Sequence, residues 1–208
     1  MKHLAWLLLT ASIAWTDGPR VVYSKSFPGS RPAWSGVILN KDGSAEYREA
    51  PDEDNPIRFT LSEADTKAIF ELAEKVEFFK RPLESGLNVA RMGEKCFRWE
   101  DGPARNEVKF NYTQDLDGQK LQDWFERITE TELHLIDLER TVRFDRLGVH
   151  KSLLELQVSW ERKRLVAPDQ FLKLLDRVAK NEVYLNIARE RAAAMAEAIR
   201  AGTAKNGE

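Results

Sequence analysis

The sequence predicts an α+β protein in which a small antiparallel sheet with one covering helix is followed by a long antiparallel helix pair. Three observations lead to this prediction. The first half contains short β-rich segments separated by turn residues, no proline occurs between Leu116 and Pro168, and apolar residues in the second half recur with helical spacing. We expect an α+β domain over residues 15–112, a C-terminal helical hairpin over residues 113–203 and a disordered tail over residues 204–208.

The expected sheet begins with a strand at residues 21–27 and continues with a hairpin whose strands cover residues 33–40 and 44–50. Between these strands, Asn40-Lys41-Asp42-Gly43 fits a type I turn that closes with glycine at positive φ, which glycine adopts without steric cost. The aspartate carboxylate can cap the same turn. We therefore interpret this polar cluster as a corner of the fold and not as a site.

A covering helix is expected after a further short strand at residues 57–60. Ser62 and Asp65 form a capping pair at its start, and its end is expected near Lys80, before Pro82. The helical spacing of four apolar residues predicts the stripe that faces the sheet: Ile69, Leu72, Ala73 and Val76.

A second hairpin is predicted between KCFRWE and EVKFNY, with its turn at residues 101–103. Because side chains alternate along a strand, Cys96 should lie on the face opposite Phe97 and Trp99. Cys96 is the only cysteine, so no internal disulfide can form. We interpret it as a small half-buried residue under a helix or at an edge, with a reactive or intermolecular thiol as the alternative.

The second half is predicted to begin with one long helix that packs on a single partner. Apolar residues occur at six positions spaced seven apart: Leu121, Ile128, Leu135, Val142, Val149 and Leu156. Gly148 predicts a kink or a break, because glycine inside a helix costs about 1 kcal/mol relative to alanine. The cations Arg162-Lys163-Arg164 are expected at the helix C-terminus, where they offset the helix dipole.

A second helix is predicted to start at Pro168, with Asp169 in its first turn. A short link joins the two helices, so they should lie antiparallel. The expected inner face of the second helix consists of Phe171, Leu174, Leu175, Val178, Leu185, Ala188, Ala192 and Ile199.

The first 15 residues, MKHLAWLLLTASIAW, have the pattern of a secretory signal peptide. A short basic start precedes an apolar run, and small residues lead to a cleavage site after Ala14, so residues 1–14 are the predicted signal peptide. The run is shorter than the roughly 20 apolar residues of a spanning helix, although retention as an uncleaved anchor is the alternative. We expect an exported, periplasmic or extracellular protein without stable membrane insertion after cleavage.

Composition and motifs argue against several functional classes. The 208 residues carry a formal net charge of -2 with acidic and basic residues interleaved, so no nucleic-acid partner is indicated. Neither a G-x-S-x-G elbow nor a phosphate-binding glycine loop occurs, and no cofactor is predicted. If the protein is an enzyme, the irregular stretch from Pro82 to Gly93 is a candidate wall of its pocket.

Two acidic segments resemble parts of calcium-binding loops, but neither has the full set of ligands. The loop Asp52-Glu53-Asp54-Asn55 has only the opening ligands of a calcium loop and is interpreted as a solvated turn. The segment Asp115-Leu116-Asp117-Gly118 lacks the distal glutamate, because the twelfth position of such a loop, counted from Thr113, is Trp124. A helix N-cap explains this segment instead.

Glu130, His134 and Asp137 are the strongest candidate constellation, because their spacing puts them on one face of the long helix. Such a face could present two carboxylates and an imidazole to one metal ion or one proton. A metal centre requires more ligands, however, and His150 is about four helical turns away. We therefore assign no catalytic, cofactor-binding or metal-binding residue and interpret the face as a paired, solvent-facing stripe.

The stretch Pro28-Gly29-Ser30-Arg31-Pro32-Ala33-Trp34, the later Asp42-Gly43 and Tyr47, and the helical segment LSEADTKAIFELAEKVEFF resemble exported bacterial domains of unknown function. Those domains open with a G-x-x-P-x-aromatic strand and a D-G hairpin, and their helix ends in an aromatic pair. A strand pair before an amphipathic helix, here EVKFNY before residues 121–128, is also similar. The likeness covers about residues 20–130 by element order.

This resemblance implies the fold and the export of the chain, and it transfers no catalytic residue. The chain departs from the pattern at Ser30 and Arg31, where such domains often carry cysteines, and the long helical hairpin is an addition. The function we expect is a non-catalytic module that binds a protein or a cell-envelope component. The alternative is an exported metal-dependent hydrolase or another small enzyme.

Overall fold

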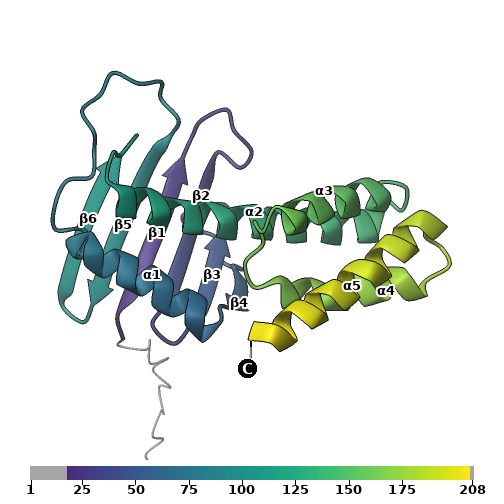
Figure 1. Cartoon of the computed structure of the whole chain (residues 1–208). Coiled ribbons are helices and arrows are strands. Elements are labelled where there is room, and N and C mark those ends of the chain that lie inside the picture. The colour runs from purple at the N-terminus through teal and green to yellow at the C-terminus, as the bar shows by residue number, and fades with distance from the viewer. Residues whose placement is uncertain (1–17, 207–208) are drawn as a thin grey trace, which may run out of the picture.

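The computed structural model describes residues 18–206, with side chains up to residue 202. The described chain forms a six-stranded antiparallel sheet and five α-helices, which confirms the α+β class (Figure 1). The long helices follow the sheet in sequence, as predicted. The predicted signal peptide at residues 1–14 lies outside the described residues.

The sheet has the strand order β4-β3-β2-β1-β5-β6, and all neighbouring strands are antiparallel. The first strand is therefore central, with Tyr23 opposite Val37 on one side and Phe97 on the other. The strands are β1 (Arg20–Ser26), β2 (Trp34–Asn40), β3 (Ser44–Arg48), β4 (Ile57–Thr60), β5 (Glu94–Asp101) and β6 (Ala104–Phe110).

The turn between β2 and β3 is a corner, as predicted. The Gly43 amide donates to the carbonyl of Asn40 (3.0 Å), and the Asp42 carboxylate accepts from the Ser44 amide (2.9 Å). Gly43 has a φ of 87°. Its carbonyl accepts from the Leu61 amide (2.9 Å), which ties the turn to the entry of the covering helix. The polar groups of this turn are therefore used by the fold.

Replacing Gly43 by Ala is expected to lower the free energy of unfolding by about 2 kcal/mol, because a Cβ disfavours positive φ. The added Cβ would also lie 2.9 Å from the Leu61 carbonyl oxygen. Gly102→Ala is the matched control, since Gly102 has a φ of 53° and no atom lies within 4 Å of the place that its added Cβ would take. Urea denaturation should show a smaller loss for the control, and equal losses would contradict the steric part of the argument.

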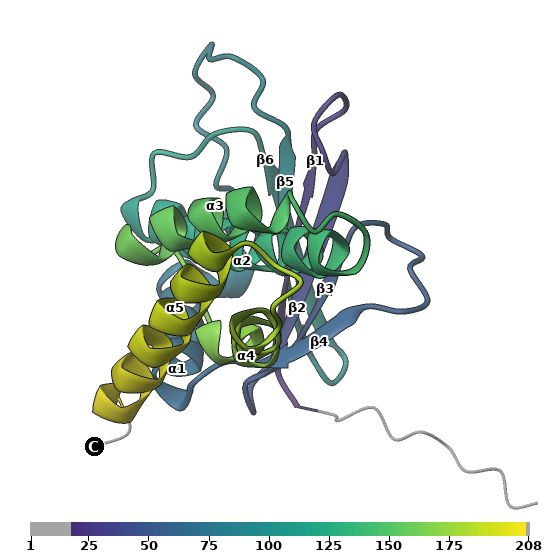
Figure 2. The same ribbon diagram turned by 90° about the vertical axis from the view of Figure 1, so that its right-hand side faces the viewer.

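Two helices cover the same face of the sheet, α1 (Glu63–Lys75) and the first half of α2 (Leu116–Phe144) (Figures 1 and 2). Ser62 caps α1 as predicted, accepting from the Asp65 amide at 3.1 Å. The helix ends earlier than expected because residues 77–79 turn through positive φ angles in η1 (Glu77–Phe79). This turn directs Phe79 into the core.

The second half of the chain forms a helical lobe, consisting of the second half of α2 with α3 (Val149–Glu161), η2 (Pro168–Phe171), α4 (Leu172–Lys180) and α5 (Asn186–Asn206). Each of the two long helices that we predicted is divided into two. The first helix breaks at Asp145–Gly148, where the Asp145 carboxylate accepts from the Gly148 amide (3.0 Å). The predicted helix pair is thus a four-helix arrangement, with α3 folding back along α2 (Figure 1).

All six residues of the seven-residue pattern are buried, as predicted. They serve two cores, however, because Leu121 and Ile128 pack under the sheet whereas the later four pack within the helical lobe. Leu185 is 46% exposed and not on an inner face, because the break at residues 181–185 ends the second predicted helix early. α5 continues to Asn206 and so includes the first residues of the predicted tail.

No helix covers the other face of the sheet (Figure 2) among the described residues, and ion pairs between side chains of the strands occupy it. Arg98 and Lys109 pair with Glu100 (2.7 Å) and Glu94 (3.5 Å). Cys96 is half-buried on this face, opposite the two aromatic residues as predicted, but it lies in an inner strand and not under a helix or at an edge. Burial raises the pKa of its thiol, which disfavours a reactive thiolate.

Candidate functional site

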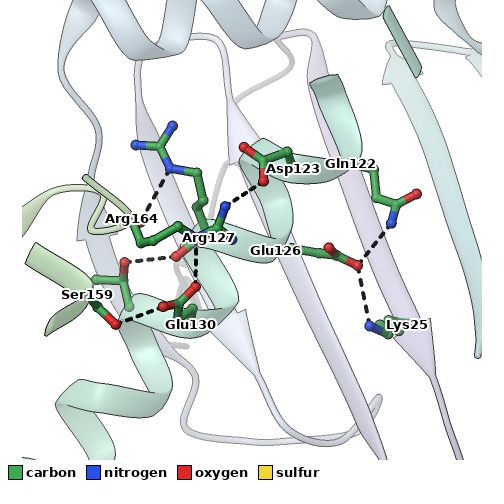
Figure 3. A network of polar contacts seen from close by, with 9 residues as sticks. Lys25, Gln122, Asp123, Glu126, Arg127, Glu130, Ser159 and Arg164 are labelled. Carbon is green, nitrogen blue, oxygen red and sulfur yellow. Dashed lines mark hydrogen bonds and ion pairs between the residues drawn. The ribbon is translucent and has the colours of Figure 1, made fainter. Parts of the chain in front are cut away.

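A network of polar side chains connects α2 to α3 and to the segment after α3 (Figure 3). Arg164 donates to Asp123 (2.6 Å) and to Glu130 (2.9 Å), and the Ser159 hydroxyl donates to the other oxygen of Glu130 (2.8 Å). The sequence predicts that Arg164 offsets the helix dipole, whereas in the structure it crosses to α2. Nearby, Lys25 on β1 pairs with Glu126 at 3.3 Å.

His134 and Ser159 lie 2.9 Å apart, which is the spacing of a nucleophile and its base. The hydrogen bonds oppose that role. Glu130 can only accept, so it takes the single hydroxyl hydrogen of Ser159, and the Nε2 of His134 must then donate to the serine oxygen. Burial lowers the pKa of His134, which keeps the imidazole neutral. A nitrogen that already carries a proton cannot activate the serine, so this arrangement is not that of a catalytic triad.

Asp137, the third member of the predicted constellation, has separate partners. It accepts from the Ser152 hydroxyl on α3 (2.5 Å) and pairs with Arg140 on its own helix. The three candidate residues therefore lie on one helix face, as their spacing predicted. Glu130 and His134 meet at the Ser159 hydroxyl, whereas Asp137 binds Ser152, so the three do not converge on one point. Within residues 18–206, no group of three or more His, Cys, Asp or Glu side chains is placed to hold a metal ion.

A pocket of about 390 Å³ borders this network and is lined mainly by polar side chains. The hydroxyls of Tyr23 and Thr129 are buried at its wall and have no hydrogen-bond partner among the described residues. Burial raises the pKa of Tyr23 well above its ordinary value, so the phenol stays neutral. The lining consists of Tyr23, Lys25, Ser35, Glu126, Thr129, Glu130, Leu133, His134 and Arg164.

Glu132 is a fully buried acid that the sequence analysis did not identify. One of its carboxyl oxygens accepts from the Gln170 amide (2.9 Å), and the other has no partner among the described residues. Burial, with a smaller contribution from the nearby Glu139, raises the pKa of Glu132 to about 7. The sequence does indicate this burial, because Glu132 stands four residues after Ile128 and three before Leu135, on the apolar stripe of the helix.

The other candidate segments have structural roles. Asp115 caps α2 by accepting from the Gly118 amide (2.7 Å), as predicted. In the acidic loop, Glu53 accepts from the Glu49 amide (2.7 Å). The irregular stretch after Pro82 borders an open pocket of about 460 Å³, in which Glu84 accepts from the Asn111 amide (2.6 Å).

A groove of about 590 Å³ runs between α2 and α4 in the helical lobe. Its apolar part includes Ile136 and Leu174, and Phe144 stands at its end with 74% of its surface exposed. Its charged residues are three arginines, Arg140, Arg143 and Arg177, and one acid, Glu139. Arg177 in this groove makes no ion pair with another described residue.

The fold and these sites define an α+β protein with a projecting helical lobe. Neither a protein-family model nor a curated protein matches the chain. The roles of the residues above therefore rest on their geometry alone. Within the described part of the chain, no helix combines the length and the apolar character needed to cross a bilayer.

Proposed function

We propose that this chain is an exported, non-catalytic module that binds a protein or another cell-envelope component through its helical lobe. The observation that carries the proposal is the open groove between α2 and α4, which combines apolar side chains with cations. Grooves of this kind accept amphipathic segments or charged surfaces.

The polar network supports the non-catalytic part of the proposal. Its carboxylates and cations are bound to one another, and the histidine that stands beside a serine donates to it. General acid–base catalysis requires a base that is free to accept a proton. The side chains of this network are used instead to hold α3 and the segment after it against α2.

A photo-crosslinking amino acid in place of Arg177 would test this function in cells that produce the chain naturally. We expect adducts with an envelope component from this position, because Arg177 lines the groove and is accessible from it. The matched control is the same replacement at Arg58, which is 72% exposed and lies on strand β4 at the edge of the sheet. Equal adduct yields from both positions, or none from position 177, would contradict binding through the groove.

The export part of the proposal has its own measurement. N-terminal sequencing of the protein recovered from cell fractions should find a chain that begins at Trp15 outside the cytosol. Recovery in the cytosol with Met1 still attached would contradict export, whatever the crosslinking experiment shows.

A further inference from the structure

The end of the helical lobe farthest from the sheet carries several exposed apolar side chains. This distal tip consists of residues 139–151, around the α2–α3 turn, and residues 177–187, around the α4–α5 turn (Figure 1). The Tyr184 hydroxyl donates to the Val142 carbonyl (3.0 Å) and joins the two segments. The exposed apolar side chains of the tip are Phe144, Leu147, Val183, Leu185 and Ile187.

The same tip is basic in a protein that is acidic overall. Its two segments contain six Lys or Arg and three Asp or Glu, for a net charge of +3, whereas the whole chain has a net charge of -2. Arg143 stacks on the Phe144 ring, with its guanidinium 5.0 Å from the ring centroid. Arg146 makes no ion pair with another described residue, so its charge is available to a partner.

Helix dipoles explain only part of this composition. Arg143 lies in the last turn of α2 and Lys180 in the last turn of α4, where cations offset the negative end of a helix. That effect does not require apolar side chains in water, and Phe144 and Leu147 are each 74% exposed. Exposed apolar side chains surrounded by cations are typical of surfaces that enter the headgroup region of an anionic bilayer.

We propose that the distal tip docks on an anionic lipid bilayer, with the apolar side chains entering the interface and the cations binding headgroups. This inference rests on the proposed function and names its envelope component. A bilayer fits better than a folded protein, because the apolar side chains project from two separate turns with charged residues between them. A fluid interface adapts to such a shape, whereas a protein interface requires a contiguous complementary patch.

The test uses the full chain and vesicles of phosphatidylcholine with or without phosphatidylglycerol. We expect stronger binding to the anionic vesicles, and a loss of at least about tenfold in affinity for Phe144→Ser with Leu147→Ser. Leu87→Ser with Leu116→Ser is the matched control, since these leucines are 50% and 71% exposed and Leu116 lies about 35 Å from the tip along α2. The control should bind within about twofold of the unaltered chain.

A second pair of variants tests the charges. Arg143→Gln with Arg146→Gln is expected to weaken binding to anionic vesicles by about tenfold and to reduce its salt dependence. The control is Arg58→Gln with Lys67→Gln, which removes two cations that are 72% and 74% exposed and lie outside the tip. Unchanged binding by the tip variant, or an equal loss in the control, would overturn the role of the tip cations.

A local probe distinguishes docking through the tip from binding through the predicted signal peptide at residues 1–14, which the full chain used in this test includes. An environment-sensitive dye on Leu147→Cys, in a Cys96→Ser background, should shift its emission to the blue with anionic vesicles. The same dye on Leu116→Cys should not shift. Equal responses at both positions would overturn docking through the tip.

The outcomes also separate this inference from the proposed function. Binding of the tip to soluble polyglutamate, without binding to vesicles, would overturn the lipid assignment in favour of an acidic protein segment. Absent vesicle binding together with adducts from position 177 would likewise overturn the lipid assignment and leave the proposed function standing. If neither vesicle binding nor adducts from position 177 were found, both the lipid assignment and the proposed function would be overturned.

Discussion

Replacing Glu132 by Gln is expected to raise the free energy of unfolding at pH 8 by about 3 kcal/mol and to leave it nearly unchanged at pH 4.5. The carboxyl group is fully buried, and burial raises its pKa from 4.5 to about 7. The folded protein therefore keeps a proton that the unfolded chain releases. Between pH 4.5 and 7 the unfolded state binds fewer protons than the folded state, so stability falls as the pH rises.

The amide of Gln has the shape of the protonated acid and can still accept from Gln170, so the variant keeps the hydrogen bond without the titration. Urea denaturation at pH 4.5, 6 and 8 should show that the difference between the two proteins grows with pH. Glu71→Gln, on the exposed surface of α1, serves as the control and should show no such growth. A constant gain from Glu132→Gln at all three pH values would contradict a shifted titration.

Phe97→Ala is expected to cost about 4 kcal/mol of unfolding free energy, because it opens a cavity at the centre of the sheet core. Phe97 is fully buried, and its ring centroid lies 5.2 Å from those of Tyr23 and Phe79 and 5.5 Å from that of Phe110. Phe125, from α2, approaches to 5.8 Å. The substitution thus removes contacts to the sheet and to a covering helix together.

Chemical denaturation followed by circular dichroism would measure this loss. Phe97→Leu, with a smaller expected loss of about 1 kcal/mol, keeps the prediction testable if the alanine variant does not fold. Phe144→Ala is the matched control, since its ring is 74% exposed and its removal should change stability by less than about 0.5 kcal/mol. Similar losses for Phe97→Ala and Phe144→Ala would mean that the sheet core does not centre on Phe97.

The predicted sheet agrees closely with the structure because short-range rules determine its parts. The alternation of Cys96, Phe97 and Trp99 predicts the inner face of β5, and the turn at Gly43 follows from the backbone freedom of glycine. The capping of α1 by Ser62 is equally local. Each of these features depends on residues within about four positions of one another.

The helices were predicted less completely, because their breaks depend on what they pack against. The seven-residue pattern identified six buried residues, yet it did not distinguish the two that pack under the sheet from the four in the helical lobe. The second break, which exposes Leu185, occurs in a segment without glycine or proline. The chain breaks the helix there because α5 can then pack against α4 and bury a shared apolar core, which local sequence does not reveal.

Prediction of the candidate site was limited in the same way, because it too depends on contacts between distant residues. Spacing placed Glu130, His134 and Asp137 on one face, but their partners Ser159, Arg164 and Ser152 are 15 to 34 residues away in sequence. Those partners changed the interpretation from a paired, solvent-facing stripe to a polar seam between helices.

The sequence by itself determined most of the buried apolar side chains, the strands and turns of the sheet, and the starts of α1 and α2, since backbone geometry and solvent exposure act over a few residues. Only the tertiary structure decided which buried surfaces meet. It brought the acid Glu132 into a core with one oxygen that has no partner among the described residues, and it brought two distant turns together as a basic, apolar tip. The physical reason is that the burial of a side chain follows largely from its place in the periodic pattern of its own helix or strand. Which residues it contacts depends on how the whole chain folds.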